Sequence, residues 1–482
     1  MKCISIINAW FWRVALLVVP LFLAAGCAMG PDVKTPSVEM PGGFIGQGVV
    51  SQQVTMADLP WWRLFKDDTL QDLVRTALTN NYDLRIAVKR VEEYQAMAAQ
   101  SRGKFFPQIG YEGDLEHSRN AFGGNTTMGT GETGNPVMLA GSAAWEIDLW
   151  GRIRRLNEAA RAELAATDAD RRGVMLTLVC NVAQSYFELL EFDLEVNIAK
   201  RTQASFQESL DIFSRKLAGG AASRLETSRA EAAVASTAAT IPDLERQIAI
   251  KENAINLLLG RNPGTIPRHA LLRDQDSPPE VPVGLPSDLL RRRPDILAAE
   301  QNLRAANAQI GVAIAQCFPK IGLTAVFGRA SLDLDSFNGD AAAWGLGGTL
   351  TGPLFQGGAL LAQIRQARAQ TEEQSLAYEQ AVRTAFQDVA NALVTRVKLE
   401  EVFAQEVRCV RCYNDAVVVS RERYIAGKAS YYEVLEAQQQ LFPAENNLAQ
   451  TKLERLTAVI QLYKALGGGW NLPDEKWGVK IP

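Results

Sequence analysis

Few side chains in this 482-residue sequence are placed to do chemistry. The two histidines, His117 and His269, lie far apart and leave little for general base catalysis or a His-rich metal site. Cys409 and Cys412 have the spacing of a redox or zinc pair, yet no second pair and no histidine lies near them in the sequence. We expect both cysteines to pack within a long helix, and whether they form a disulfide stays open.

Other patterns that mark enzyme sites are weak. The glycines within residues 345–358 lack the lysine and the spacing of a phosphate-binding loop. Glu92 and Glu93 point in different directions on a helix, which is typical of a solvated surface. Lysine and arginine number 50 against 54 acids, and the resulting net charge of −4 disfavours nucleic-acid binding. The sequence therefore predicts no enzyme, no metal site, no cofactor and no nucleic-acid partner.

The N-terminus has the layout of a bacterial export signal. An uncharged, mostly aliphatic run over residues 14–25 is too short for a membrane span, which needs about 20 apolar residues. It leads into Ala24-Ala25-Gly26-Cys27, which resembles the lipobox of bacterial lipoproteins. We expect a signal peptide over residues 1–26, a covalent lipid on Cys27 and a Gly- and Pro-rich tether over residues 27–58. The alternative is an ordinary cleavage site with an incidental cysteine.

The rest of the chain reads as two copies of one plan. Residues 83–110 match residues 295–322 at an offset of 212, and both stretches end in a Phe-Pro-x-Ile-Gly sequence. Residues 220–226 match residues 427–433 at an offset of 207. Agreement at both ends indicates an internal duplication. We assign the first repeat to residues 59–270, the second to residues 285–470 and a C-terminal tail to residues 471–482.

Each repeat has helices, a strand pair and a long helical hairpin. The strand pairs are expected at about residues 105–149 and 318–355, and the hairpins at about residues 152–260 and 358–467. Residues 153–217 contain no proline and one glycine, and residues 359–426 contain neither, so each helix could reach ~100 Å. Leu176, Cys180, Ala183 and Phe187 are spaced like the core of a coiled coil. A second apolar stripe beside them predicts that each long helix has neighbours on two sides.

The strands alternate between apolar and polar residues. Ile109, Tyr111 and Leu115 alternate with Glu112 and Asp114, a period-two pattern that suits either a soluble sandwich or a membrane barrel. Four strands are too few to close a barrel, and open edges are not tolerated in lipid. Because three copies would supply about twelve strands and leave room for an aqueous lumen, we favour a trimer.

The expected fold is therefore mostly α, with a small β part. It is a duplicated unit whose long coiled-coil helices form a trimeric α-barrel, with four strands per chain contributing to a shared membrane β-barrel.

Several sequence motifs add a family resemblance. They are the lipobox at Cys27, Trp61-Trp62-Arg63-Leu64-Phe65, Asn181-Val182-Ala183-Gln184-Ser185-Tyr186-Phe187, Arg293-Pro294-Asp295-Ile296, Ala305-Ala306-Asn307-Ala308 and Leu466-Gly467-Gly468-Gly469-Trp470. Together the motifs cover nearly the whole mature chain. The sequence resembles the TolC-type outer-membrane factors, specifically the lipoprotein branch that serves RND efflux pumps, the OprM, CusC and NodT-like group.

The resemblance implies a function, a location and partners. It implies a homotrimer in the cell outer membrane with a long periplasmic extension, joined through a periplasmic adaptor (membrane fusion) protein to an inner-membrane RND pump. The channel would be a passive conduit for small toxic compounds. The transported compound is set mainly by the pump, so the sequence does not name it.

The resemblance also implies roles for residues at the two hairpin turns. Glu433 and Glu436 would form the periplasmic constriction, Glu226 and Tyr424 would belong to the tether that holds the tip closed, and Gly220 and Gly427 would mark the tips that contact the adaptor. The alternative for the acids is that residues in a first helical turn complement the helix dipole and face solvent.

Two rival functions remain open from the sequence. The export channel of a type I (ABC) protein secretion system shares the same architecture. A non-conducting coiled-coil envelope lipoprotein, acting as a spacer, belongs to another class. The alternating strands count against the spacer, which needs no apolar sheet face with an acidic reverse.

Overall fold

The computed structural model describes residues 28–39, 58–64, 66–119, 133–275, 288–331, 336–337, 339 and 341–469. The chain forms two compact units. Unit 1 comprises residues 1–37, 90–168 and 298–379, and unit 2 comprises residues 38–89, 169–297 and 380–482. Both units draw on both repeats. Four helices contribute residues to each unit: α4 (Tyr82–Gly103), α5 (Arg152–Ala218), α8 (Pro294–Ala315) and α9 (Ala359–Ile425). Cys27 lies outside the described residues.

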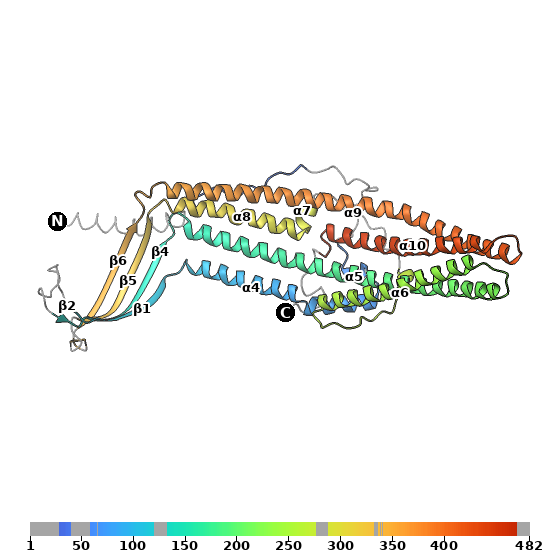
Figure 1. Cartoon of the computed structure of the whole chain (residues 1–482). Helices are drawn as coiled ribbons and strands as arrows, with labels where there is room; N and C mark the ends of the chain where they lie inside the picture. Colours follow the sequence, from blue (N-terminus) through green and yellow to red (C-terminus); the bar gives the residue numbers. More distant parts are fainter. Residues whose placement is uncertain are drawn as a thin grey trace, which may run out of the picture. The chain divides into compact units, whose positions relative to one another are not determined.

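Helices dominate the described chain (Figure 1). The first repeat contains α2 (Trp61–Leu64), α3 (Asp68–Asn80), α4 (Tyr82–Gly103), β1 (Gln108–Leu115), β2 (Ser118–Arg119), β3 (Thr133–Gly134), β4 (Val137–Ile147), α5 (Arg152–Ala218) and α6 (Arg224–Leu258). The 3-10 helix η2 (Leu272–Asp274) follows. The second repeat contains α7 (Leu289–Arg292), α8 (Pro294–Ala315), β5 (Lys320–Ser331), β6 (Ala342–Thr351), α9 (Ala359–Ile425) and α10 (Tyr431–Ala465).

The element lengths confirm the duplication. The long helices α5 and α9 have 67 residues each, α6 and α10 have 35 each, and α4 and α8 have 22 each. The long helices also begin and end within one residue of the expected ranges. Residues free of proline and nearly free of glycine propagate a helix without a break, so the local sequence is enough to set these lengths.

Unit 1 contains an antiparallel sheet with strand order β1-β4-β5-β6 (Figure 1). The β4–β5 pair joins the two repeats into one sheet, and β1 and β6 form its edges. Residues 341–364 carry no charge and are long enough for a membrane helix, but they form β6, a turn and only the first residues of α9. Their glycines and Pro353 disfavour a helix, as expected.

The pairing register gives this sheet two different faces. Residues directly opposite each other in paired strands share a face. One such row consists of Tyr111, Gly141, Phe327 and Trp344, and its three aromatic side chains are 89%, 77% and 75% exposed. The neighbouring row, on the other face, contains the acid Glu112 and three small residues. The sheet therefore presents an apolar surface on one side and an acidic, small-residue surface on the other.

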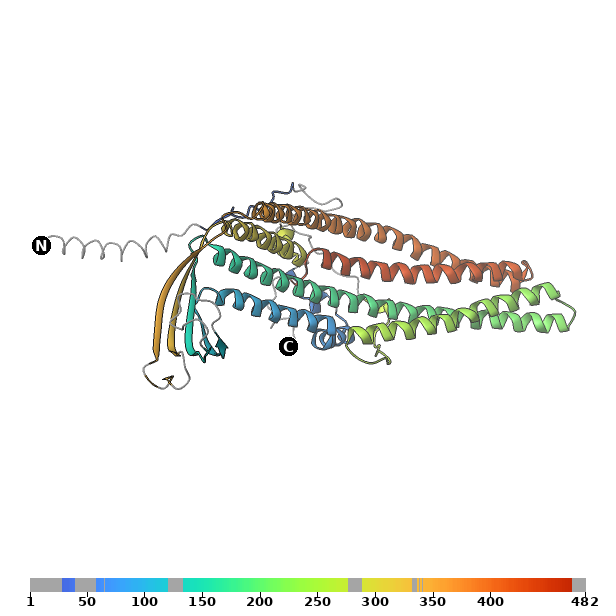
Figure 2. The ribbon, with the colours of Figure 1, turned by 60° about the vertical axis from the view of Figure 1, so that its left-hand side comes forward.

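Unit 2 is built around the long helices (Figure 2). The predicted coiled-coil stripe of α5 is buried, and the second stripe, Val179, Val182, Tyr186 and Leu189, is fully buried. Helix α5 thus has neighbours on two sides, as its double stripe predicted. It is also the one described helix that is apolar and long enough to cross a membrane, but 61% of its most apolar stretch is buried within the fold. The burial indicates a core helix.

Equivalent contacts within unit 2 link the end of one helix to the start of another. Asn81, just before α4, donates from Nδ2 to the Leu258 carbonyl at 2.9 Å. Arg293, just before α8, donates from Nη1 to the Ala465 carbonyl at 3.2 Å. These residues are related by the repeat offsets of 212 and 207. Gly260 follows α6 with φ +66°, and a Cβ there would lie 2.5 Å from the Asn80 carbonyl oxygen, so only glycine fits.

Candidate functional site

The two hairpin tips of unit 2 have the same backbone geometry. Gly220 and Gly427 adopt φ +74° and +69°, and a Cβ on either would meet no atom within 4 Å. The amide of Gly220 donates to the Leu217 carbonyl, and that of Gly427 donates to the Tyr424 carbonyl. A 6→1 bond follows in both turns, which makes each a Schellman termination. Backbone conformation alone therefore requires glycine at these positions.

The acid after each turn has a different task. Glu226 completes a capping box with Ser223: its carboxylate accepts from the Ser223 amide at 2.7 Å, and its own amide donates to Ser223 Oγ at 3.3 Å. The equivalent acid, Glu433, has no such partner because the Ser430 side chain makes no capping hydrogen bond. Glu433 instead forms an ion pair with Arg423, with 3.5 Å between its carboxylate oxygen and Arg423 Nε.

Tyr424 connects the two hairpins. Its hydroxyl accepts a hydrogen bond from the Lys216 ammonium group, which also lies 4.4 Å from the Tyr424 ring centroid. The Tyr424 ring packs edge-on against Tyr431, with centroids 5.2 Å apart, and Tyr431 packs against Phe213 at 4.3 Å. A lysine from α5 and aromatic residues from α9 and α10 thus hold the tips together within one chain.

An apolar cluster supports this contact. Its buried members come from α5, α6 and α10, and they are Phe206, Phe213, Ala230, Ala233, Tyr431, Val434 and Leu435. Burial raises the pKa of the Tyr431 phenol. The cluster fixes the position of the first turn of α10, and therefore of Glu433.

Glu433 and Glu436 both lie on the exposed side of this turn. They are three residues apart and share one helical face. Among the described residues, no hydrogen bond or ion pair involves the Glu436 side chain. Two exposed carboxylates thus lie beside a tip whose other residues pack in the apolar cluster.

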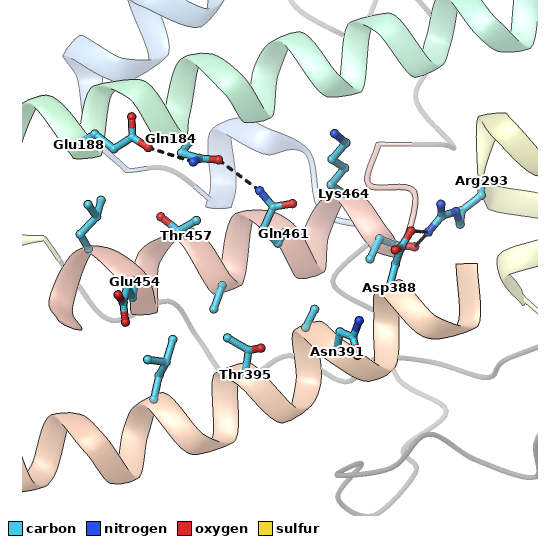
Figure 3. Close-up of a pocket in the computed structure, with 15 residues that line it drawn as sticks. Gln184, Glu188, Arg293, Asp388, Asn391, Thr395, Glu454, Thr457, Gln461 and Lys464 are labelled. Atoms are coloured by element: carbon cyan, nitrogen blue, oxygen red, sulfur yellow. Dashed lines mark hydrogen bonds and ion pairs between the residues drawn. The ribbon is translucent and has the colours of Figure 1, made fainter. Parts of the chain in front are cut away.

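A second polar region in unit 2 is a cavity of about 680 Å³ between α5, α9 and α10 (Figure 3). Gln184 on α5 donates to Glu188 at 3.0 Å and accepts from Gln461 at 3.2 Å. At the other end of the cavity, Arg293 pairs with Asp388 at 2.9 Å. Amide, hydroxyl and charged side chains line the cavity, so it offers polar contacts.

Buried carboxyl groups on α5 lie close to the residues of this cavity. Glu191 is 5% exposed, and burial, followed by the charge of Glu195, raises its pKa to about 8. Glu188 adds to the repulsion while it pairs with Lys251 at 2.6 Å. The sequence analysis missed this cluster. The available signal was the position of Glu191, which lies directly beside the apolar stripes of α5 in the sequence.

The cysteine pair lies inside α9, as expected. Cys409 is partly buried, whereas Cys412 is exposed and does not pack as expected, and both are free thiols. Within the described ranges, no group of three or more histidine, cysteine or acidic side chains is arranged to hold a metal ion.

The structure brings some predicted site residues together and separates others. Tyr424 and Glu433 lie at one tip, whereas Glu226 is engaged in capping its own helix. The partners Lys216 and Arg423 were missed in the sequence analysis. Basic residues in the last turns of α5 and α9 were the available signal, because such residues commonly complement a helix C-terminus.

Comparison with known proteins finds similar proteins over most of the chain. The family model described as "Outer membrane efflux protein" matches residues 73–261 and 285–468. The toluene efflux pump outer membrane protein TtgC of Pseudomonas putida is 34% identical over 459 residues, which cover 94% of this chain and 95% of that protein. The cation efflux system protein CusC of Escherichia coli is 33% identical, with coverage of 92% and 96%.

Solved structures agree with the fold. The outer-membrane channel OprN superposes with a TM-score of 0.85 at 30% identity, over 92% of this chain and 100% of that one. The open state of the Neisseria gonorrhoeae MtrE outer membrane channel superposes with a TM-score of 0.82 at 31% identity, over 92% and 99%. The family match spans both repeats, and the relatives are covered almost completely. The chain belongs to the outer membrane efflux protein family.

Proposed function

We propose that this chain is the outer membrane channel of a tripartite RND-type efflux system, a passive conduit that carries small toxic compounds from an inner-membrane pump and a periplasmic adaptor to the exterior. The observation that carries the proposal is the two-faced sheet with unpaired edges, in a chain of the efflux family. Relatives named for toluene and cation efflux support efflux over protein secretion. The conduit needs no catalytic residue and no resident cofactor.

Closure of the membrane wall is proposed to require three copies. Among the described residues, β1 and β6 are the edge strands of the sheet and each pairs on one side only, and lipid does not satisfy unpaired backbone groups. Three copies would supply about twelve strands, enough for an aqueous lumen. The apolar row of Tyr111, Phe327 and Trp344 would then face lipid, and the acidic face would line the lumen.

Attachment to the membrane is proposed to include a lipid on Cys27, the residue after the export signal. The expected location is the outer membrane, with the helical hairpins in the periplasm. Mass spectrometry of the N-terminal peptide tests the modification directly.

The hairpin tips are the proposed periplasmic end. Three copies of Glu433 and Glu436 would form a negative ring that narrows the pore and favours cations. Glu226 and Tyr424 would tether the resting tip, and the turns at Gly220 and Gly427 would contact the adaptor. The Lys216–Tyr424 bond supports a tether that holds one hairpin against the other.

Two measurements on the purified protein test the function and its rivals. In planar bilayers we expect ohmic single-channel currents, which a non-conducting spacer would not give. In pull-downs from native membranes we expect a periplasmic adaptor and an RND pump. Recovery of an ABC exporter in place of the RND pump would assign the channel to type I secretion and contradict the proposal.

A further inference from the structure

The first described residues of the chain are docked within unit 1, against the turn before α5 and against helices α5 and α8. The Met29 amide donates to the Trp150 carbonyl at 3.1 Å, and Asn307 Nδ2 donates to the Pro31 carbonyl at 2.8 Å. Trp150 precedes α5 and Asn307 lies on α8. This segment was expected to be part of an extended tether, yet its backbone is bound by two elements that are far apart in sequence.

A buried arginine supplies most of the polar contacts. Arg155 on α5 is 6% exposed, and it donates from Nε to the Met29 carbonyl at 3.0 Å and from Nη2 to the Gly30 carbonyl at 3.2 Å. It also pairs with Asp32 at 3.3 Å and with Glu158 at 2.8 Å. Burying a guanidinium is costly unless its donors find acceptors. Three of the acceptors come from residues 28–32, so the site is complete only when the segment is bound.

Glycines leave room for the segment. A Cβ on Gly311 in α8 would lie 2.4 Å from the Met29 carbonyl oxygen, and a Cβ on Gly151 would lie 2.6 Å from Ala28 Cα. A glycine inside a helix costs about 1 kcal/mol relative to alanine. The close approach of Met29 gives a physical reason for glycine at position 311.

The docked segment lies at the helix-proximal end of the sheet. Gly151 is in the turn between β4 and α5, and Trp150 stacks on Phe318 just before β5, with centroids 4.7 Å apart. Exposed Phe106 and Phe355 flank the same ends of β1 and β6. Aromatic residues at the end of an apolar sheet face are typical of a membrane–water interface.

We propose that Gly151, Arg155, Asn307 and Gly311 form a docking site, here called the tether cradle, that binds residues 28–32 and sets the height of the acylated Cys27 at this interface. Adjacent Cα atoms are about 3.8 Å apart, so Cys27 follows wherever Ala28 is held. The cradle would place the lipid beside the sheet end instead of leaving it on a loose tether. This inference rests on the proposed lipidation of Cys27, while the docking itself does not.

Hydrogen–deuterium exchange of the mature protein in nanodiscs tests the cradle. The variant is Gly311→Ala, and the matched control is Gly173→Ala, another glycine inside a helix, where a Cβ would make only an ordinary 3.6 Å contact. We expect the Met29 amide to be protected in the parent and the control. In Gly311→Ala we expect its exchange to be about tenfold faster, equivalent to ~1.4 kcal/mol of docking free energy.

A second variant, Asn307→Ala, distinguishes loss of docking from misfolding of α8. Asn307→Ala removes the bond to the Pro31 carbonyl and favours the helix, so it should speed exchange of the segment while amides elsewhere in α8 stay protected. An unprotected Met29 amide in the parent protein, or unchanged exchange in both variants, would overturn the cradle. The mass of the N-terminal peptide is read in the same samples. A protected segment without an acyl group would overturn the lipid-positioning role and the proposed lipidation but leave the docking intact.

Discussion

Residues at equivalent positions of the two repeats perform different tasks. Glu226 and Glu433 are related by the offset of 207, yet Glu226 caps its own helix and Glu433 pairs with Arg423. The difference arises one turn earlier, where Ser223 makes its capping bond and Ser430 does not. Duplication preserved the backbone of the tip and freed one acid for another use.

The capping box makes a local prediction. Glu226→Ala should destabilise the first turn of α6 by about 1 kcal/mol, because the Ser223 amide loses the carboxylate that accepts its hydrogen bond. Glu433→Ala, at the equivalent place, should leave the first turn of α10 unchanged within a few tenths of a kcal/mol. Exchange rates of the amides in the two turns measure both effects. Equal losses in the two repeats would contradict the assigned difference.

The exposed acids predict the ion selectivity of the pore. Replacing both Glu433 and Glu436 with Gln should lower cation-over-anion selectivity and weaken block by trivalent cations added on the periplasmic side, because the proposed ring would lose its charge. Single-channel recordings measure both quantities. The control is Glu372→Gln, an exposed acid of α9 far along the chain from the tip. A double variant that matches the control would rule out the ring.

At the scale of elements, helix α5 is buried on two sides and carries carboxyl groups that are shielded from solvent. Glu188, Glu191 and Glu195 follow one another at intervals of three and four residues, so they lie along one side of the helix. Burial raises the pKa of both Glu191 and Glu195. A helix whose sides are buried by packing thus carries a carboxyl group, that of Glu191, whose charge depends on pH near neutrality.

This cluster predicts a pH-dependent stability. The folded Glu191 carboxyl keeps its proton up to about pH 8, whereas an unfolded glutamate loses it near pH ~4.3. The folded state therefore binds more protons across this window, and stability should fall as the pH rises from 5 to 8. Glu191→Gln should flatten this part of the profile. Thermal unfolding midpoints at several pH values measure it, and a parent protein that gains stability between pH 5 and pH 8 would contradict the prediction.

At the scale of the whole molecule, the four-stranded sheet of one chain is open and not closed into a barrel. Within the described chain, β1 and β6 each pair on one side only, and the exposed aromatic row of Tyr111, Phe327 and Trp344 has no covering layer. Neither feature suits a stable monomer in water. Both are satisfied when copies pair edge to edge in a bilayer.

Proline substitution distinguishes a paired edge from a free one. Successive backbone N–H groups of a strand point to opposite sides. Of the two variants Glu112→Pro and Gly113→Pro in β1, one therefore removes an N–H group that faces β4. The other removes an N–H group that faces the outer edge of the sheet. If copies pair through this edge, both variants should reduce the detergent-stable trimer measured by native mass spectrometry. If the edge is free, only one variant should be impaired.

Much of the architecture follows from local sequence. The lengths of α5 and α9 depend on runs without proline, and the strands depend on alternation such as Ile109, Glu112 and Leu115. Periodicity and chain-breaking residues act over a few positions, so one sequence suffices to read them. The duplication is similarly visible because both copies keep their glycines at the turns.

By itself, the sequence determined the repeats, the element types and the residues at the hairpin turns, since these depend on neighbours along the chain. Only the tertiary structure decided that Lys216 bonds to Tyr424, that Arg423 pairs with Glu433 in place of a capping box, and that Arg155 binds the carbonyl of Met29. Two of these contacts join residues more than a hundred positions apart, and the third spans a turn. Side-chain partners depend on how helices pack side by side, which no local pattern encodes.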